Sequence, residues 1–269
     1  MDIPERYGDY INWDQLPHLW CPGCGNGIAL KGVALALAKL NIPPHKVLLA
    51  TGIGCSGRAG NYVSFHSFDG THGRTLAFCT GINVAQPDLH IIAFLGDGDC
   101  GAIGGNHLLH AARRNLNVTV LEINNFNYAM TGGQFSPTTP LCSVTSTSRK
   151  GKAEYTMDTA ALVVNAGANY VACTTVYHTA QLNTFVKEAI LTRGFSFVEI
   201  FSSCPTYYGR YNDMGDGPAM MRWFKEKALP RYKYEKLSHD EKQEYLVRGR
   251  LVQRNREDFL TAYKKCRKK

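Results

Sequence analysis

The residues LHIIAFLGDGD, from Leu89 to Asp99, decide the fold of this 269-residue chain. The run from Leu89 to Leu95 is almost continuously apolar, which is typical of a strand buried on both faces of a parallel sheet. The run ends in a turn of glycines and aspartates, and ligands of open α/β sheets bind at this carboxyl end of the strands. Glycines in such a turn let the backbone approach phosphate oxygens. The stretch therefore predicts a doubly wound α/β domain with a phosphate-binding edge.

Strands and helices alternate on both sides of this stretch. We expect helices over residues 26–40, 103–114, 159–166 and 180–191, and strands over 47–53, 118–123, 170–174 and 195–201. Such alternation predicts a mostly parallel sheet covered by helices. Residues 136–155 are rich in Ser, Thr and Pro, so we expect a long functional loop there. We place one α/β domain over 1–217 and a basic, helical C-terminal extension over 218–269.

The positive charge of the chain is concentrated near its C-terminus. Residues 222–269 hold 16 Lys and Arg against 7 Asp and Glu, a net charge of +9, whereas residues 1–221 hold 14 against 15. A basic segment can indicate nucleic acid, but a solvated helical extension is the simpler interpretation. Docking of an acidic protein is the other interpretation, because opposite charges speed encounter. We expect no nucleic-acid partner.

Two further features concern the location of the chain. The sequence contains no run of about 18 or more uncharged apolar residues, so we expect no membrane-spanning helix. The stretch from Met1 to Arg6 is polar and lacks the apolar region of a signal peptide. We therefore expect a cytoplasmic protein with no membrane partner. The nine cysteines fit metal ligation better than disulfides in such a compartment.

Oxygen ligands follow two successive strands of the expected sheet. Asp97 comes directly after the first strand, and Asn125 follows the next one along the chain. The Asp97 carboxylate, the Asn125 side-chain carbonyl and the Asn127 backbone carbonyl form a set that suits Mg²⁺, which keeps its other positions for water and phosphate. This GDG…NN arrangement resembles the motif that binds thiamine diphosphate. The simpler alternative is a pair of ordinary turns, since Asn and Asp both favour turns.

Four cysteines have positions that allow them to converge. Cys21 and Cys24 form a CPGC turn before the first helix, where a helix N-terminus favours thiolates. Cys55 and Cys204 each follow a strand, at the sheet edge expected to carry Asp97. Four thiolates at one edge suit a [4Fe–4S] cluster. We interpret the remaining cysteines as structural or incidental, with Cys100 the least certain because it adjoins the Asp97 turn.

The motifs occur together in the order found in one known family. Over roughly residues 19–211, the chain resembles the β subunits of 2-oxoacid:ferredoxin oxidoreductases. The shared motifs are WCPGCG from Trp20, GIGCS from Gly52, THGR from Thr71, GDGD from Gly96, GGNH from Gly104, YAMTGGQ from Tyr128, SPT from Ser136 and CPT from Cys204. The C-terminal segment is the part least covered by the resemblance.

The resemblance implies roles for particular residues. The cluster ligands fall on Cys21, Cys24, Cys55 and Cys204, and the Mg²⁺ ligands on Asp97, Asn125 and the Asn127 carbonyl. The positions around thiamine diphosphate are Gly54, Cys55, His72, Gly96, Gly98, Asp99, Tyr128 and Thr131, together with the Mg²⁺ ligands. Arg58 falls where relatives carry a basic residue that contacts the substrate, and Met130 where an apolar side chain faces it. A loop histidine such as His72 is, on sequence alone, more often neither a cofactor nor a substrate contact.

The resemblance also implies an activity and partners. The reaction is oxidative decarboxylation of a 2-oxoacid with coenzyme A to acyl-CoA and CO₂, reversible, with electrons passing through the cluster to ferredoxin. We expect 2-oxoglutarate because Arg58 can pair with its distal carboxylate. Arg58 can equally pair with a diphosphate or with a partner chain, and pyruvate or branched-chain or aromatic 2-oxoacids stay possible. An α subunit must supply the pyrimidine-binding domain, because this chain carries only the diphosphate-type domain; ferredoxin-like γ or δ subunits are optional.

Two other classes of function are alternatives. A non-redox thiamine-dependent lyase accounts for Asp97 and Asn125 but leaves the four cysteines unexplained. A zinc-stabilised binding protein accounts for cysteines and charge but not for the two strand-end oxygen ligands. Iron and labile sulfide content distinguishes all three.

Overall fold

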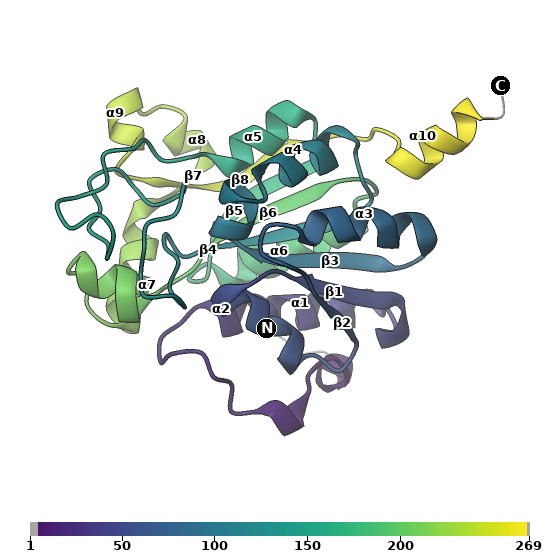
Figure 1. Cartoon of the computed structure of the whole chain (residues 1–269), viewed down its shortest axis with the longest axis horizontal. Helices are drawn as coiled ribbons and strands as arrows, with labels where there is room; N and C mark the ends of the chain where they lie inside the picture. Colours follow the sequence, from purple (N-terminus) through teal and green to yellow (C-terminus); the bar gives the residue numbers. More distant parts are fainter. Residues whose placement is uncertain (1–4, 268–269) are drawn as a thin grey trace.

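The computed structural model describes residues 5–267 and contains one eight-stranded sheet (Figure 1). Its strands are β1 (Val47–Thr51), β2 (His66–Asp69), β3 (His90–Gly96), β4 (Thr119–Asn124), β5 (Tyr170–Thr175), β6 (Ser196–Phe201), β7 (Ala228–Pro230) and β8 (Leu246–Gln253). They lie in the order β2-β1-β3-β4-β6-β5-β8-β7. Strands β1 to β6 are parallel, β8 is antiparallel to β5, and β7 is parallel to β8. The predicted mostly parallel α/β fold is therefore confirmed.

Helices cover both faces of this sheet. They are α1 (Asn26–Leu40), α2 (Gly54–Gly57), α3 (Thr75–Ala85), α4 (Gly105–Arg113), α5 (Thr159–Ala166), α6 (Thr179–Leu191), α7 (Gly217–Lys227), α8 (Arg231–Tyr234), α9 (His239–Lys242) and α10 (Phe259–Cys266). Helices α3, α4 and α5 form one layer, in front of the sheet in Figure 1, and α1 packs against α6 behind it. Within residues 5–267, none of these helices has the length and apolar composition needed to cross a bilayer.

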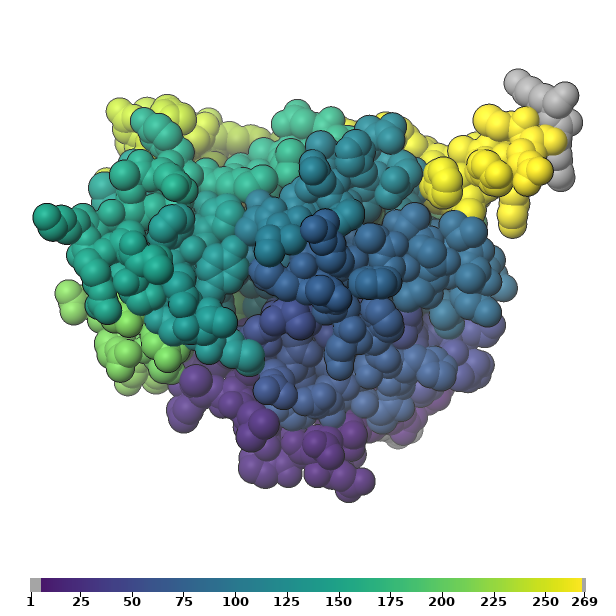
Figure 2. All heavy atoms as spheres, in the orientation of Figure 1, coloured from purple at the N-terminus to yellow at the C-terminus, as the bar shows by residue number. Residues whose placement is uncertain are grey.

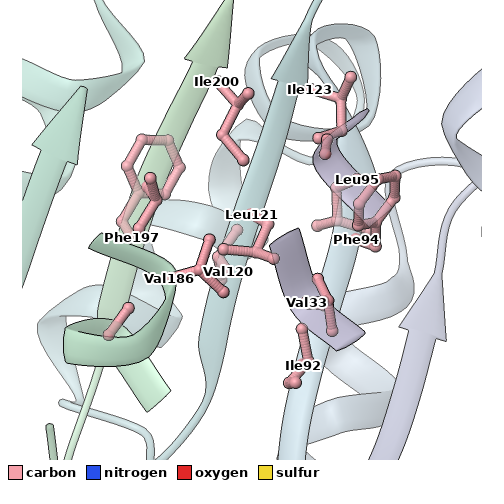
Figure 3. Close-up of a cluster of buried hydrophobic side chains, with 14 of the residues drawn as sticks. Val33, Ile92, Phe94, Leu95, Val120, Leu121, Ile123, Val186, Phe197 and Ile200 are labelled. Atoms are coloured by element: carbon pink, nitrogen blue, oxygen red, sulfur yellow. The ribbon is translucent and has the colours of Figure 1, made fainter. Parts of the chain in front are cut away.

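The central strands make the hydrophobic core. Every residue of β4, β5 and β6 is buried, as expected for strands covered on both faces. Figure 3 shows Phe94 of β3, Leu121 of β4 and Phe197 of β6 packed in one cluster, with Val33 of α1 and Val186 of α6 closing it from the helices. This rigid centre fixes the positions of the strand ends that carry the predicted ligands.

The C-terminal extension is not wholly helical, so that prediction was wrong in part. The eight-residue strand β8 pairs with β5 and extends the sheet, and the three-residue β7 pairs with β8. In β8, LVRGRLVQ, pairs of apolar residues flank Arg248 and Arg250, and the count of basic residues hid this apolar content. The boundary between a domain at 1–217 and an extension at 218–269 stays a prediction.

Two elements of the fold were missed by the sequence analysis, and one predicted stretch lies partly outside the described residues. Strand β2 and helix α3 were not predicted; α3, TLAFCTGINVA, is uncharged and has no polar face to mark its period. The polar N-terminal stretch that led us to expect a cytoplasmic protein falls partly on residues 1–4, which lie outside the described residues. The remaining predicted helices and strands are present, with ends that differ by at most two residues, and with α4 preceded by a π-helical turn over Gly98–Ala102.

Candidate functional site

An open cavity lies at the carboxyl ends of strands β1, β3 and β4. Its volume is about 200 Å³. Its walls contain all the residues predicted around the cofactor: Gly54, Cys55, His72, Gly96, Asp97, Gly98, Asp99, Asn125, Asn127, Tyr128 and Thr131, together with Met130. Figure 2 shows the surface hollowed between the blue segment near residues 50–75 and the teal segment near 130–150.

Two hydroxyl groups hold the Asp97 carboxylate in this cavity. Its Oδ2 accepts hydrogen bonds from the Ser136 hydroxyl at 2.5 Å and from the Thr138 hydroxyl at 2.7 Å. Burial raises the pKa of Asp97 to about 6, although both hydroxyls oppose that shift. A carboxylate that is costly to ionise and held in one orientation is suited to a cation, which restores the charge balance.

The next strand ends in a strained turn. Phe126 adopts a left-handed φ of 65°, between the two asparagines predicted to bind Mg²⁺. The Asn127 backbone N–H donates to Asn125 Oδ1 at 3.3 Å, and Asn127 Nδ2 donates to the Asn125 carbonyl at 2.7 Å. The Phe126 ring is held by Phe201 and Tyr208. Packing therefore maintains a backbone conformation that L-residues avoid, as is common at functional sites.

Asp99, a predicted cofactor contact, also joins three loops of the protein. Its carboxylate accepts backbone N–H groups from Ile53, Gly73 and Gly96, at 3.1–3.4 Å, and thereby ties together the loops after β1, β2 and β3. His72 Nδ1 lies 2.6 Å from Asp99 Oδ1. Asp99 lines the cavity, and its carboxylate also positions His72 and the three loops.

Two glycines shape the cavity wall. A Cβ on Gly98 would lie 2.1 Å from the Tyr128 ring, so only glycine lets Tyr128 pack there. Gly54 has φ +79° and no atom within 4 Å of the place where its Cβ would be. The backbone at Gly54 is therefore open to a ligand, whereas Gly98 is needed for packing.

The predicted loop over residues 136–155 is held together by a buried lysine. Lys152 is 2% exposed, and its ammonium group donates to the backbone carbonyls of Pro137, Thr139, Glu154 and Tyr155 at 3.0–3.4 Å. Burial lowers the pKa of Lys152. This loop, drawn in teal at the left of Figure 1, carries Ser136 and Thr138 to Asp97.

The four predicted cluster cysteines belong to three segments that hydrogen bonds join. The Trp20 indole N–H donates to the Cys55 carbonyl at 2.7 Å. The Ser203 hydroxyl donates to the Gly23 carbonyl at 2.7 Å, and the Gly25 N–H donates to the Ser203 carbonyl at 3.2 Å. These bonds join the segment of Cys21 and Cys24 to those of Cys55 and Cys204.

The electrostatics of these thiols agree with their proximity. Burial raises the pKa of Cys24 to about 12, opposed by the Asn26 backbone N–H and increased by Cys204, Cys55 and Cys21. Burial also raises the pKa of Cys55 to about 11, with further contributions from Cys204 and Cys21. The thiols therefore disfavour each other's ionisation, and a cationic group between them would reverse that effect.

In residues 5–267, no three His, Cys, Asp or Glu side chains are close enough to share one metal ion. Neither the predicted Mg²⁺ ligands nor the predicted cluster cysteines need three such side chains around one ion. The predicted Mg²⁺ set has a single carboxylate, with asparagine oxygens as the other ligands. A [4Fe–4S] cluster binds each thiolate through its own iron, so its ligands are spread more widely than those of one ion.

Some residues do not have the positions or contacts that the sequence suggested, and others were missed. Arg58 is exposed and does not line the cavity. Cys100 is buried, and burial raises its pKa well above the usual range, which fits a structural thiol. The wall residues that sequence reasoning missed are Asn26, Ile53, Ser56, Ile123 and Ala129. Ile53, Ser56 and Ala129 belong to the quoted motifs, and Asn26 and Ile123 lie within two residues of a predicted site residue or motif. This proximity in sequence is the signal that could have identified them.

Comparisons with known proteins agree with this geometry. Residues 45–200 match the family described as "Thiamine pyrophosphate enzyme, C-terminal TPP binding domain". The chain is 43% identical over 251 residues to the 2-oxoglutarate synthase subunit KorB of Methanocaldococcus jannaschii, a match that covers 93% of each chain. It is 45% identical over 248 residues to the KorB subunit of Methanothermobacter thermautotrophicus, covering 92% of this chain and 87% of that one.

A solved structure extends the similarity to the whole fold. The chain superposes with a TM-score of 0.85 and 30% identity on the 2-oxoglutarate:ferredoxin oxidoreductase from Magnetococcus marinus with 2-oxoglutarate, coenzyme A and succinyl-CoA bound. The superposition covers 97% of this chain and 89% of that one. The likeness therefore includes the C-terminal segment, which the sequence motifs left uncovered.

Proposed function

This chain belongs to the β-subunit family of the 2-oxoacid:ferredoxin oxidoreductases, and we propose that it holds thiamine diphosphate, Mg²⁺ and one [4Fe–4S] cluster in a complex that oxidatively decarboxylates 2-oxoglutarate. One observation carries the proposal: every residue predicted around the cofactor lines a single cavity, and Cys55 belongs both to that cavity and to the predicted cluster set. In this proposal the thiamine and cluster sites would be adjacent.

The diphosphate end of the site fits its cofactor. Asp97, Asn125 and the Asn127 carbonyl would hold Mg²⁺, because they supply hard oxygen ligands at two neighbouring strand ends. The open backbone at Gly54 leaves room for the cofactor. Thiamine diphosphate, when bound, supplies the electron sink for decarboxylation. The chain's own contribution is to orient the Mg²⁺ ligands through Ser136 and Thr138 and to close the wall with Tyr128.

The cysteine end of the site fits an iron–sulfur cluster. Cys21, Cys24, Cys55 and Cys204 would each bind one iron. This assignment is supported by the hydrogen bonds that join the three segments carrying the four thiols, and by the proximity through which Cys204 and Cys21 add to the raised pKa values of Cys24 and Cys55. In the proposed complex, electrons pass from the thiamine site through this cluster to ferredoxin, and the reaction is reversible.

For the substrate we propose 2-oxoglutarate, with coenzyme A as acyl acceptor. The support is that the relatives described above are named 2-oxoglutarate synthase subunits, and that the related solved structure contains 2-oxoglutarate and coenzyme A. Met130, which is half exposed in the cavity wall, would contact the substrate. Arg58 is exposed and follows the cavity residue Cys55 by three positions, and it would be the partner of the distal carboxylate of the substrate.

The proposal includes partner chains. An α subunit would supply the pyrimidine-binding domain, and ferredoxin-like γ or δ subunits are optional. Ferredoxin would be the electron acceptor, with the basic C-terminal segment as one surface that an acidic protein can approach. We place the complex in the cytoplasm, which agrees with nine cysteines that are all free thiols.

The test is to purify the native complex anaerobically and measure iron, labile sulfide and zinc before recording visible and EPR spectra. We expect four irons per chain, and bleaching of the cluster absorption when 2-oxoglutarate and then coenzyme A are added. Zinc without iron would overturn the redox assignment and favour a zinc-stabilised protein. Bound thiamine without iron would indicate a non-redox lyase. Bleaching with another 2-oxoacid, but not with 2-oxoglutarate, would change the substrate alone.

A further inference from the structure

Asn26 lies at the boundary between the cysteine segments and the thiamine cavity. It is the first residue of α1, two residues after Cys24, and its backbone N–H donates to the Cys24 thiol. Its side-chain Oδ1 accepts a hydrogen bond from the Ser202 hydroxyl at 3.3 Å, two residues before Cys204. Asn26 also lines the cavity. Asn26 is thus attached to two of the cysteine segments while it faces the cavity.

The amide nitrogen of Asn26 has no hydrogen-bond partner within residues 5–267. The residue is 1% exposed, and Nδ2 is among the buried side-chain nitrogens without an acceptor. The Ser202 hydroxyl donates to Oδ1, so of the two polar atoms of the side chain only Nδ2 lacks a partner. Folding rarely leaves a buried polar group without a partner, because the group loses its hydrogen bonds to water. Because Asn26 lines a ligand cavity, the partner of this donor is expected to be a bound group.

We propose that Asn26 is a positioning residue that donates its Nδ2 hydrogen bond to a sulfur atom of the iron–sulfur cluster, on the side that faces the thiamine cavity. The inference rests on the proposed function, since it requires the cluster. The cluster is favoured over the diphosphate because the other two polar groups of Asn26 both connect to cysteine segments. On the opposite side, Cys204 Sγ lies 4.0 Å from Asn127 Oδ1, an acceptor that cannot supply a proton.

This hydrogen bond has a definite consequence for electron transfer. Donors to cluster sulfurs stabilise the reduced, more negative state and raise the reduction potential. Asn26 would therefore favour the transfer of an electron from the thiamine site to the cluster. Its removal should shift the cluster toward the oxidised form at a given potential, without removing a ligand of iron or of Mg²⁺.

The experiment compares Asn26→Ala and Asn26→Leu with wild type in the native complex. The leucine keeps the side-chain volume, so it serves where the alanine variant assembles poorly. Asn83→Ala is the matched control: Asn83 is also 1% exposed with an unpaired amide, but it lies on α3, outside the cavity wall. The readouts are iron content, the EPR-monitored reduction potential of the cluster, and the affinity for thiamine diphosphate with Mg²⁺.

We expect both Asn26 variants to hold full iron and to bind thiamine diphosphate as wild type does, while the ratio of reduced to oxidised cluster falls about tenfold, or about 59 mV for a one-electron couple. Asn83→Ala should leave the potential unchanged. An unchanged potential in the Asn26 variants overturns the inference alone, and weaker thiamine binding with an unchanged potential reassigns the donor to the diphosphate. A wild-type complex without iron overturns the proposed function, and the inference with it.

Discussion

The cavity around Asp97 and the four-cysteine region are neighbours, but they are built in opposite ways. At Asp97, hydroxyls from Ser136 and Thr138 already hold the carboxylate, and Lys152 holds the loop that delivers them. In the cysteine region, hydrogen bonds join the backbone segments, whereas Cys24 and Cys55 have raised pKa values that the other thiols increase. The first region is ordered before a ligand arrives, whereas the second needs a cationic group to become stable in its ionised form.

This contrast predicts that each region can be lost separately, and the cysteine region should show the larger effect. Cys24→Ser should lose nearly all cluster iron, because the hydroxyl that replaces the thiol is a poor iron ligand. Binding of thiamine diphosphate with Mg²⁺ should persist, because Asp97 and its partners lie in another segment. Iron and sulfide assays with EPR measure the first effect, and calorimetry of thiamine diphosphate binding measures the second.

Cys266→Ser is the control, since Cys266 is exposed on the last helix. A Cys24→Ser protein with full iron would contradict the assignment of the cluster ligands. A variant that loses iron and thiamine binding together would contradict the independence of the two regions.

The second prediction tests the preorganised region. Asp97→Asn should weaken the affinity for thiamine diphosphate with Mg²⁺ by about 100-fold or more, because a neutral amide replaces the only carboxylate of the proposed ligand set. The asparagine carbonyl can still accept from Ser136 and Thr138, so the loop should stay in place. Titration calorimetry measures the affinity, and the visible spectrum should show the cluster intact.

Asp69→Asn is the matched control, because Asp69 ends β2 at the same sheet edge but lies outside the cavity wall and accepts from Thr51 at 2.7 Å. If Asp97→Asn bound thiamine diphosphate as tightly as Asp69→Asn, Asp97 would not be an Mg²⁺ ligand.

In the Asp97 cavity and the four-cysteine region, the residues that directly follow a strand were predicted from sequence. The buried run before Gly96 and the following strand place Asp97 and Asn125 at one edge whatever the loops do, because parallel strands share that edge. Asn26 could not be predicted in the same way: its amide is recognised as unpaired only once Ser202, far away in the chain, is placed against it. Asp99 shows a similar limit, since its bonds to three loops depend on tertiary structure.

The edges of the fold were harder to predict for a different reason. Central strands are mainly apolar and buried on both faces, whereas β8 is half exposed and carries arginines that pair outward, such as Arg250 with Glu188 at 2.7 Å. Local composition in β8 reflects the surface more than the core. The sequence pattern therefore identified what is buried on both faces and missed what joins the sheet from its margin.

The smallest expected effect concerns a pair of acids beneath the ordered cavity. Glu199 of β6 lies beside Glu122 of β4, and Asn124 Nδ2 donates to Glu199 Oε1 at 2.8 Å. Asn124 Oδ1 lies 3.0 Å from the Thr138 hydroxyl, which also contacts Asp97, so the pair is linked to the cavity. Burial, and then Asp158, raise the pKa of Glu199 from 4.5 to about 7.

Because the folded state then holds this proton more tightly than the unfolded state, Glu199 stabilises the fold below pH 4.5 and loses that contribution as the pH rises through about 7. Glu199→Gln stays neutral, and its carbonyl can still accept from Asn124. The variant should therefore gain stability relative to wild type between pH 5 and pH 8, by on the order of 1–3 kcal/mol. Unfolding temperatures of the purified protein across that range measure the difference. A constant difference at every pH would mean that Glu199 has the same pKa in the folded and unfolded states, and would contradict a raised pKa for this buried acid.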